Sequence, residues 1–438
     1  MKISLIQPVH SDFVVMKTGD KSKIFKPAQL TMPYIAACTP EKHEVEIHDE
    51  IVKPLDISKI NGEVVGITAV TPFVHRAYSL AKELRKKGQT VVLGGPHASS
   101  VPDEAAQHVD AVVVGEGDFL WKDVLSDFEK RKLKKIYRNE KEVPLNNLPM
   151  PRWDLLDEKR YYIPQVVQAS RGCPHSCDFC ALSLVYPGYR CRPVDDVVAE
   201  VSRIPFKQFV FWDDNICGNK TWARELFVKL KPLKKHWYGQ STINIAKDKN
   251  LVKLAAASGC KGLFVGLESF NENSLKGANK GFNKAQEYKN LVKILNGHGI
   301  GVMAGLMFGF DTDDQSTFDN TLRQCIDIGL SAISCSIVVP YPGTGLFQRL
   351  TDENRLYTTD WSKYTSDDVV FRHENLSDMD IKNGYQYVGA NFFKFGSIFK
   401  RWIKSGFLSP KPYWGLNYAN NIYFKRLAEI SSGKSNIK

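Results

Sequence analysis

The sequence lacks long hydrophobic stretches. None of its 438 residues belongs to an apolar run close to the roughly eighteen residues that a membrane-spanning helix needs. The apolar run at residues 1–8 is also too short for a signal peptide. The nine cysteines follow no regular pairing pattern, which argues against a secreted disulfide scaffold. Together these absences predict a protein of the reducing cytoplasm with no membrane span.

Two common catalytic signatures are missing as well. The sequence contains no Ser–His–Asp arrangement and no zinc-binding motif that would offer a competing chemistry. Six cysteines have no C-x-x-C partner, namely Cys38, Cys191, Cys217, Cys260, Cys325 and Cys335. Each of them is expected to be a small buried hydrophobic residue, so a second metal cluster is not predicted.

The composition is that of a globular protein with a basic surplus. A hydrophobic fraction of 43% and a charged fraction of 24% are typical of a chain that can bury a large core. The formal net charge is +11, from 59 Lys and Arg against 48 Asp and Glu. Such a charge could serve nucleic acid, anionic lipid or an acidic substrate, but it is spread over much of the chain and also fits a solvated surface.

The most informative motif is a group of three cysteines, Cys173, Cys177 and Cys180, spaced C-x-x-x-C-x-x-C. Three thiolates can bind three irons of a [4Fe–4S] cluster and leave the fourth iron open, whereas electron-transfer clusters usually take four cysteines. A zinc site would need a fourth ligand at a matching spacing, and His175 lies between the cysteines rather than beyond them. A disulfide would leave one of the three unpaired. The spacing therefore favours a cluster with an open iron.

Residues 1–140 alternate short β-branched runs with helical stretches. Strands are expected at 2–7, 44–48 and 64–68 and in the runs 90–97 and 111–117, with a helix over 76–87. Strands without polar alternation, separated by helices, predict a parallel sheet covered on both faces, hence a doubly wound, Rossmann-like α/β domain. Ligands of such domains bind at the carboxyl ends of the strands, where the turns Gly94-Gly95 and Gly115-Glu116-Gly117 fall.

Three further segments complete the predicted organisation. Residues 141–165, which include Pro144, Pro149 and Pro151, form a linker to a second α/β series over 166–345. Its strands are expected at 166–170, 208–213, 237–244, 262–267, 299–309 and 332–340, with helices at 220–233, 247–258, 284–298 and 315–328. Six strand–helix units predict a partial (β/α)6 barrel, whose chemistry belongs at the carboxyl ends of the strands. Residues 346–438 form a small, mostly helical region, in which 390–404 are expected to form a basic amphipathic helix that docks on the barrel or contacts an anionic membrane.

The cysteine motif and the strand ends that follow it resemble the radical S-adenosylmethionine (SAM) enzymes. In that family SAM binds the open iron through its amino and carboxylate groups. The resemblance implies SAM contacts from the aromatic residue before the third cysteine and from residues at the later strand ends, namely Phe179, Asp213, Asp214, Gln240, Glu268 and Met307. An acidic pair at a strand end could also cap a helix, and Glu268 could belong to a structural ion pair.

The glycine turns of the first domain resemble the cobalamin-binding domain fused to class B radical SAM enzymes. Glycines permit the close backbone approach that a buried nucleotide tail requires, and a small hydroxyl residue can bond its base. The resemblance implies cobalamin contacts from Thr68, Thr71, His75, Gly94, Gly95, His97, Gly115, Glu116 and Gly117. The chain departs from the methionine-synthase type, because it reads Gln7-Pro8-Val9-His10 where a D-x-H-x-x-G motif would stand. His75 is then a candidate ligand for the lower face of the cobalt.

The resemblance implies a cobalamin-dependent radical SAM methyltransferase with a [4Fe–4S] cluster, SAM and cobalamin as cofactors. A 5′-deoxyadenosyl radical would abstract hydrogen from an unactivated carbon, and methylcobalamin would donate the methyl group. The alternative is a cyclisation, rearrangement or redox step with the same cofactors. Expected partners are a small-molecule, lipid or peptidyl substrate and a reductant such as flavodoxin or ferredoxin. Peripheral membrane contact is an open possibility, and no nucleic acid is expected because no added RNA-binding module is present.

Overall fold

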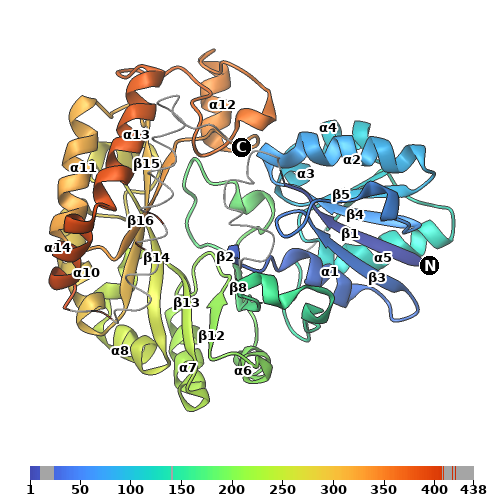
Figure 1. The fold of residues 1–438 in the computed structure, drawn as a ribbon, viewed down its shortest axis with the longest axis horizontal. Helices are drawn as coiled ribbons and strands as arrows, with labels where there is room; N and C mark the ends of the chain where they lie inside the picture. The colour runs from blue at the N-terminus through green and yellow to red at the C-terminus, as the bar shows by residue number, and fades with distance from the viewer. Residues whose placement is uncertain (10–23, 140–141, 407, 409–416, 418–419, 421–438) are drawn as a thin grey trace.

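The first half of the chain folds around a parallel six-stranded sheet (Figure 1). The structure, a computed structural model, describes residues 1–9, 24–139, 142–406, 408, 417 and 420. The strand order is β3-β1-β4-β5-β6-β7, with β1 Lys2–Gln7, β3 Glu44–Asp49, β4 Val64–Thr68, β5 Thr90–Gly94, β6 Ala111–Val114 and β7 Ile136–Arg138. Every residue of β4 is buried, as expected for a strand that is covered on both faces.

Helices cover both faces of this sheet. On one face lie α1 Thr31–Cys38 and α5 Gly117–Glu129, and on the other α2 Val74–Lys86, α3 Pro96–Ser100 and α4 Pro102–His108 (Figure 1). This layering confirms the predicted doubly wound domain. The order of strands reverses between β1 and β4, and open α/β sheets bind their ligands at the carboxyl ends of the strands beside such a point.

The second half contains an open parallel sheet whose order follows the chain. The order is β16-β15-β14-β13-β12-β9, with β9 Val166–Val167, β12 Gln208–Phe211, β13 His236–Ser241, β14 Cys260–Glu268, β15 Gly301–Phe308 and β16 Ala332–Ile337. Its helices are α6 Val194–Arg203, α7 Lys220–Leu230, α8 Lys249–Ala257, α9 Glu272–Gly277, α10 Tyr288–Gly297 and α11 Gln315–Asp327. Because β9 and β16 are not neighbours in this sheet, the barrel is partial, as predicted.

The first predicted barrel strand, 166–170, is in fact two strands. After β9 the chain turns into β10 Ser170–Gly172, which pairs antiparallel with β11 Tyr189–Cys191. The cause is Asp213, whose carboxylate accepts hydrogen bonds from the backbone N–H groups of Ala169 and Ser170, so these groups do not extend the parallel sheet. The resulting hairpin holds the cysteine loop, residues 173–188, between its strands.

The predicted linker has structure of its own. It contains the single-turn helices η4 Trp153–Leu155 and η5 Glu158–Arg160, followed by β8 Tyr161–Ile163, which pairs in parallel with β2 Ile24–Pro27. The linker therefore folds back on the amino-terminal part of the chain. The predicted domain limits at 140, 165 and 345 stay a prediction.

The carboxyl-terminal region contains α12 Gly345–Asp352, the single-turn helix η10 Trp361–Lys363, α13 Asp378–Phe392 and α14 Phe395–Lys404. One amphipathic helix over 390–404 was expected, but the backbone becomes extended at Lys394 and divides it. The break lets α14 fold back so that the Arg401 guanidinium lies 3.6 Å from the centre of the Phe392 ring. Among the described residues, no helix combines the length and apolar character needed to cross a bilayer. Most residues after 406 lie outside the described part.

Candidate functional site

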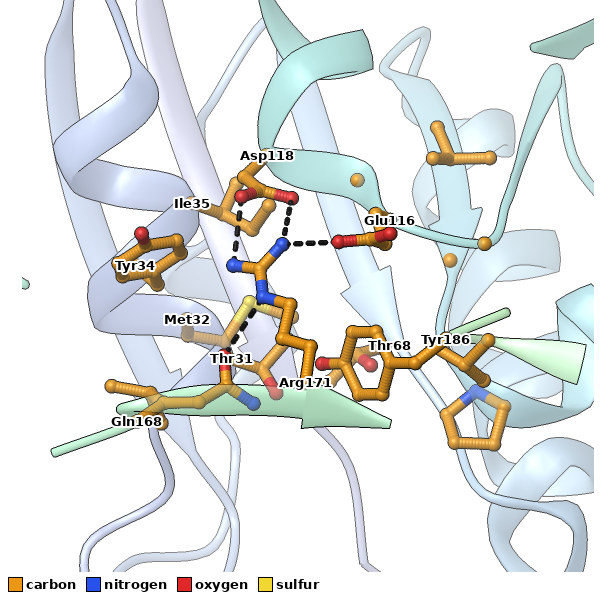
Figure 2. Close-up of a pocket in the computed structure, with 18 of the residues that line it drawn as sticks. Thr31, Met32, Tyr34, Ile35, Thr68, Glu116, Asp118, Gln168, Arg171 and Tyr186 are labelled. Atoms are coloured by element: carbon orange, nitrogen blue, oxygen red, sulfur yellow. Dashed lines mark hydrogen bonds and ion pairs between the residues drawn. The ribbon is translucent and has the colours of Figure 1, made fainter. Parts of the chain in front are cut away.

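A cavity of about 480 Å³ lies between the carboxyl ends of the first sheet and the opening of the second (Figure 2). From the first domain it is lined by predicted cobalamin contacts, namely Thr68, Gly94, Gly95, Gly115, Glu116 and Gly117. From the second domain, Asp214 and Gln240, both predicted SAM contacts, face the same space. The fold thus brings eight of the predicted site residues to one cavity.

The inner end of this cavity is an apolar slot within the first domain. Its walls are the strand residues Leu5, Gly66, Val92 and Val113 together with Trp121 from α5. A side chain at Gly94 would meet only Val113, at 3.7 Å, so the missing side chain leaves open space. A buried apolar slot beside the Thr68 hydroxyl suits the aromatic base of a nucleotide tail, so these residues fit cobalamin.

Three of the predicted cobalamin contacts lie elsewhere. Thr71 is buried in the single-turn helix η3 Thr71–Phe73 and does not line the cavity. His75 is about half exposed, and its Nε2 lies 3.2 Å from a carboxylate oxygen of Asp360. Its imidazole therefore turns to the carboxyl-terminal region and away from the cavity. His10, which ends the run Gln7-Pro8-Val9-His10, lies outside the described residues.

His97 takes part in the contact between the first domain and the carboxyl-terminal region. Its side chain is fully buried and packs against the rings of Tyr78 and Trp361. The Trp361 indole N–H donates to Glu104 at 2.9 Å, and the Tyr78 hydroxyl donates to the same carboxylate at 3.0 Å. These contacts give His97 a packing role, and its side chain does not line the cavity.

The three motif cysteines share the loop between β10 and β11, and all three are free thiols. Cys173 and Cys177 are half-buried and Cys180 is exposed. Burial raises the pKa of the Cys177 thiol to about 11, while the charge of Lys280 acts in the opposite direction on all three thiols. A cation beside the loop favours thiolate ligands.

The same loop is held from both sides by backbone hydrogen bonds. Asp178 donates its N–H to the carbonyl of Ala278 and accepts the N–H of Leu346, both at 3.1 Å. Among the described residues, no three His, Cys, Asp or Glu side chains gather closely enough to hold a single metal ion. A cluster does not require this, because each cysteine binds a different iron. The donor set fits a cluster held by three thiolates.

Lys280 is a site residue that the sequence did not reveal. Its ammonium lies 2.6 Å from the carboxylate of Glu268 at the end of β14, and both side chains are about 10% exposed. It also lies 5.8 Å from the ring centre of Phe179, a predicted SAM contact. Among the described residues, Glu268 therefore forms an ion pair, which is the alternative role that the sequence left open for it. No motif spacing marks Lys280, because only the fold brings it to the cysteine loop.

The remaining predicted SAM contacts differ in position. Asp213 is fully buried, and its carboxylate accepts hydrogen bonds from Ala169 and Ser170 beneath the cysteine loop. Burial raises the pKa of Asp213 to about 7 and that of Asp214, which faces the cavity, to about 6. Met307 is half-buried on β15 against the hydrophobic cluster around α2. Within the acidic pair, Asp213 therefore accepts hydrogen bonds from the backbone, whereas Asp214 lines the cavity.

Because Asp313 is a buried carboxylate, we expect the stability of the folded protein to depend on pH. Its buried carboxylate accepts hydrogen bonds from the backbone N–H groups of Gly309 at 2.9 Å and Phe310 at 3.0 Å. Burial raises its pKa from 3.8 to about 6, so between these values the folded protein keeps a proton that the unfolded chain has lost. The contribution of Asp313 to the free energy of unfolding should therefore fall by about 3 kcal/mol as the pH rises through this window and then level off.

Asp313→Asn should remove this component while keeping an oxygen that can accept the two N–H groups. Denaturant unfolding of both proteins across the same pH window measures the difference. Equal pH dependence of the two proteins would contradict the assignment.

Comparisons with known proteins divide the chain in the same way. Residues 27–122 match the family model described as the B12 binding domain, and residues 167–325 match that of the Radical SAM superfamily. The chain is 27% identical over 438 residues to the bacteriochlorophyllide d C-12(1)-methyltransferase of Chlorobaculum tepidum, covering 97% of this chain and 93% of that protein. It is 30% identical over 431 residues to an uncharacterized methyltransferase of Pyrococcus horikoshii, covering 90% and 92%.

Two further similarities bear on the reaction and the fold. The anaerobic magnesium-protoporphyrin IX monomethyl ester cyclase of Cereibacter sphaeroides is 24% identical over 402 residues, covering 82% of this chain and 64% of that protein. The structure of the cobalamin-dependent SAM radical enzyme OxsB, with aqua-cobalamin and SAM bound, superposes with a TM-score of 0.65 at 14% identity. That match covers 98% of this chain and 72% of the other, which shows a shared fold.

Proposed function

The chain belongs to the cobalamin-dependent radical SAM enzymes, and from this premise we propose that it is a methyltransferase acting on an unactivated carbon. One observation carries the proposal: a single cavity is walled by the cobalamin-binding turns on one side and by Asp214 and Gln240 of the barrel on the other. A substrate in this space would meet both cofactors. Two relatives of similar length named as methyltransferases support the same reaction.

The chain's own residues bind the cofactors and exclude water. The three motif cysteines would hold the cluster, Asp214 and Gln240 would bind polar groups of SAM, and the glycine turns would admit cobalamin. When bound, the cluster with SAM supplies a radical that abstracts hydrogen, and cobalamin supplies the methyl group. The apolar walls keep water from the radical, which would otherwise be lost to side reactions.

A second candidate function rests on the cyclase relative, which is 24% identical in an alignment that covers 82% of this chain. A cyclisation or redox step would use the same cavity and the same cysteines, and would consume no methyl group. Product analysis separates the two functions.

A small-molecule substrate is the partner we favour, and the relatives named for bacteriochlorophyllide and magnesium-protoporphyrin support a tetrapyrrole or another large apolar molecule. Lipid and peptidyl substrates remain part of the proposal.

The net charge of +11 would attract an acidic electron carrier such as a flavodoxin or ferredoxin. Phe399 and Ile403, about half exposed on α14 near Lys400, support contact with an anionic membrane surface. A cytoplasmic location completes the proposal.

The test is to count the products that derive from SAM. The full chain, reconstituted with cluster and cobalamin without oxygen, is given reductant, SAM with a deuterated methyl group, and tetrapyrrole, lipid or peptide fractions. Methylation predicts S-adenosylhomocysteine and 5′-deoxyadenosine in about equal amounts, with the deuterated methyl group in a product of higher mass. Substrate-dependent 5′-deoxyadenosine without S-adenosylhomocysteine would reject methylation in favour of the second function.

A further inference from the structure

The hairpin that holds the cysteine loop contains an unfavourable pair of charges. Arg171 on β10 stands directly opposite Arg190 on β11 in the antiparallel register. Like charges directly opposite each other destabilise an antiparallel pair. Both side chains are also largely buried, with 4% and 12% exposed, so water does little to screen the repulsion between the two charges. The hairpin therefore needs negative partners from elsewhere.

Those partners come from the cobalamin-binding domain. Glu116 accepts a hydrogen bond from each arginine at 2.5 Å. Asp118 accepts two from Arg171 at 2.8 and 3.1 Å, and Figure 2 shows the contacts of Arg171 with both carboxylates. Both carboxylates are about 95% buried, at the start of α5. We call Glu116, Asp118, Arg171 and Arg190 the interdomain network. Its two positive and two negative charges balance, as buried ions require, and Arg190 also pairs at 3.3 Å with Glu142, an exposed residue of the predicted linker.

The interdomain network lies between the two cofactor sites. Arg171, Glu116 and Asp118 line the cavity, whereas Arg190 does not. The Arg171 guanidinium lies 5.5 Å from the ring centre of Tyr34 and 5.6 Å from that of Tyr186, which also line the cavity (Figure 2). Along the chain, Arg171 is two residues before Cys173. A ligand in the cavity therefore meets groups that also set the position of the cluster loop.

We propose that the interdomain network couples the two cofactor sites, so that cluster assembly strengthens cobalamin binding and cobalamin in turn stabilises the cluster loop. Linkage makes this effect reciprocal, because a change in one affinity requires an equal change in the other. Arg190 is a positioning residue in this scheme, since it acts on the cavity only through Glu116. Couplings between sites in proteins commonly change affinity by about 5- to 150-fold.

The test measures cobalamin affinity with and without the cluster. Hydroxocobalamin is titrated into full-length protein, cluster-loaded and cluster-free, and the absorbance change gives the two dissociation constants. In the natural protein the cluster should tighten binding about tenfold. In Arg190→Gln the ratio of the two constants should fall towards one, and this ratio measures the coupling even if the variant also changes the affinity of the cluster-free form.

Two controls keep the outcome decisive. Arg203→Gln removes an exposed arginine at the end of α6 and should keep the full ratio. Arg190→Lys keeps the charge and should restore part of the ratio if Arg190→Gln loses it. In the reverse direction, bound hydroxocobalamin should slow removal of iron by a chelator in the natural protein and not in Arg190→Gln. A ratio of one in the natural protein, or an unchanged ratio in folded Arg190→Gln, would overturn the proposal.

Discussion

Cys177→Ala should abolish cluster assembly and with it the cleavage of SAM. Cys177 is the central cysteine of the loop, and its thiol interacts electrostatically with those of both Cys173 and Cys180. With two thiolates left, the cluster would lose one of its three protein ligands. Loss of an outer-shell partner already costs about 10- to 100-fold in metal affinity or activity, so the loss of a ligand should cost more than about 100-fold. Iron and sulfide content and the yield of 5′-deoxyadenosine are the measurements.

Cys191→Ala provides the matched control. Cys191 is also a half-buried free cysteine and lies on β11, close to the loop, but it is outside the motif. The variant should keep its iron and its 5′-deoxyadenosine yield. A normal cluster in Cys177→Ala, or an equal loss in both variants, would reject the assignment of the loop.

Gly94→Leu should separate the two halves of the reaction. Gly94 lies at the end of β5 with an ordinary backbone conformation, and a Cβ there would make only ordinary contacts with Val113, at 3.7 Å or more. The leucine side chain would then occupy the cavity without straining the strand. Overpacking of this kind costs about 1–3 kcal/mol, so cobalamin should bind about 5- to 150-fold more weakly.

The cluster loop is untouched by this change, so Gly94→Leu should keep its iron and still cleave SAM while methyl transfer is lost. Hydroxocobalamin titration and product analysis measure the two effects. Gly297→Leu, at the exposed end of α10 where a Cβ meets no atom within 4 Å, is the control for the same substitution and should behave as the natural protein. Unchanged cobalamin affinity in Gly94→Leu would show that the cavity is not the cobalamin site.

Several predictions from the sequence are confirmed. The two parallel sheets, the partial barrel and the membership in the cobalamin-dependent radical SAM enzymes, with the cofactors that these domains hold, all agree with the fold and with the matched family models. They could be predicted because their signals are local: three cysteines lie within eight residues, and each glycine turn directly follows a buried strand. The extent of the amphipathic helix at 390–404 was wrong, because the backbone becomes extended at Lys394 and α14 folds back so that Arg401 contacts Phe392 of α13.

The tertiary structure alone decided how individual side chains are paired. Arg171 and Glu116 are 55 residues apart in the chain, and His75 and Asp360 are 285 apart. No periodicity or spacing relates residues at such distances, because their contact depends on how the two sheets and the carboxyl-terminal region pack together.

The sequence by itself determined the two domains and their cofactors, since the cysteine motif and the glycine turns are recognised from their local spacing. Which carboxylate faces the cavity and which supports the backbone was decided by burial, as Asp213 and Asp214 demonstrate. The same holds for the charges between the domains. Arg171 and Arg190 would repel each other in an isolated hairpin, and the buried carboxylates of the other domain compensate their charges once the domains have docked.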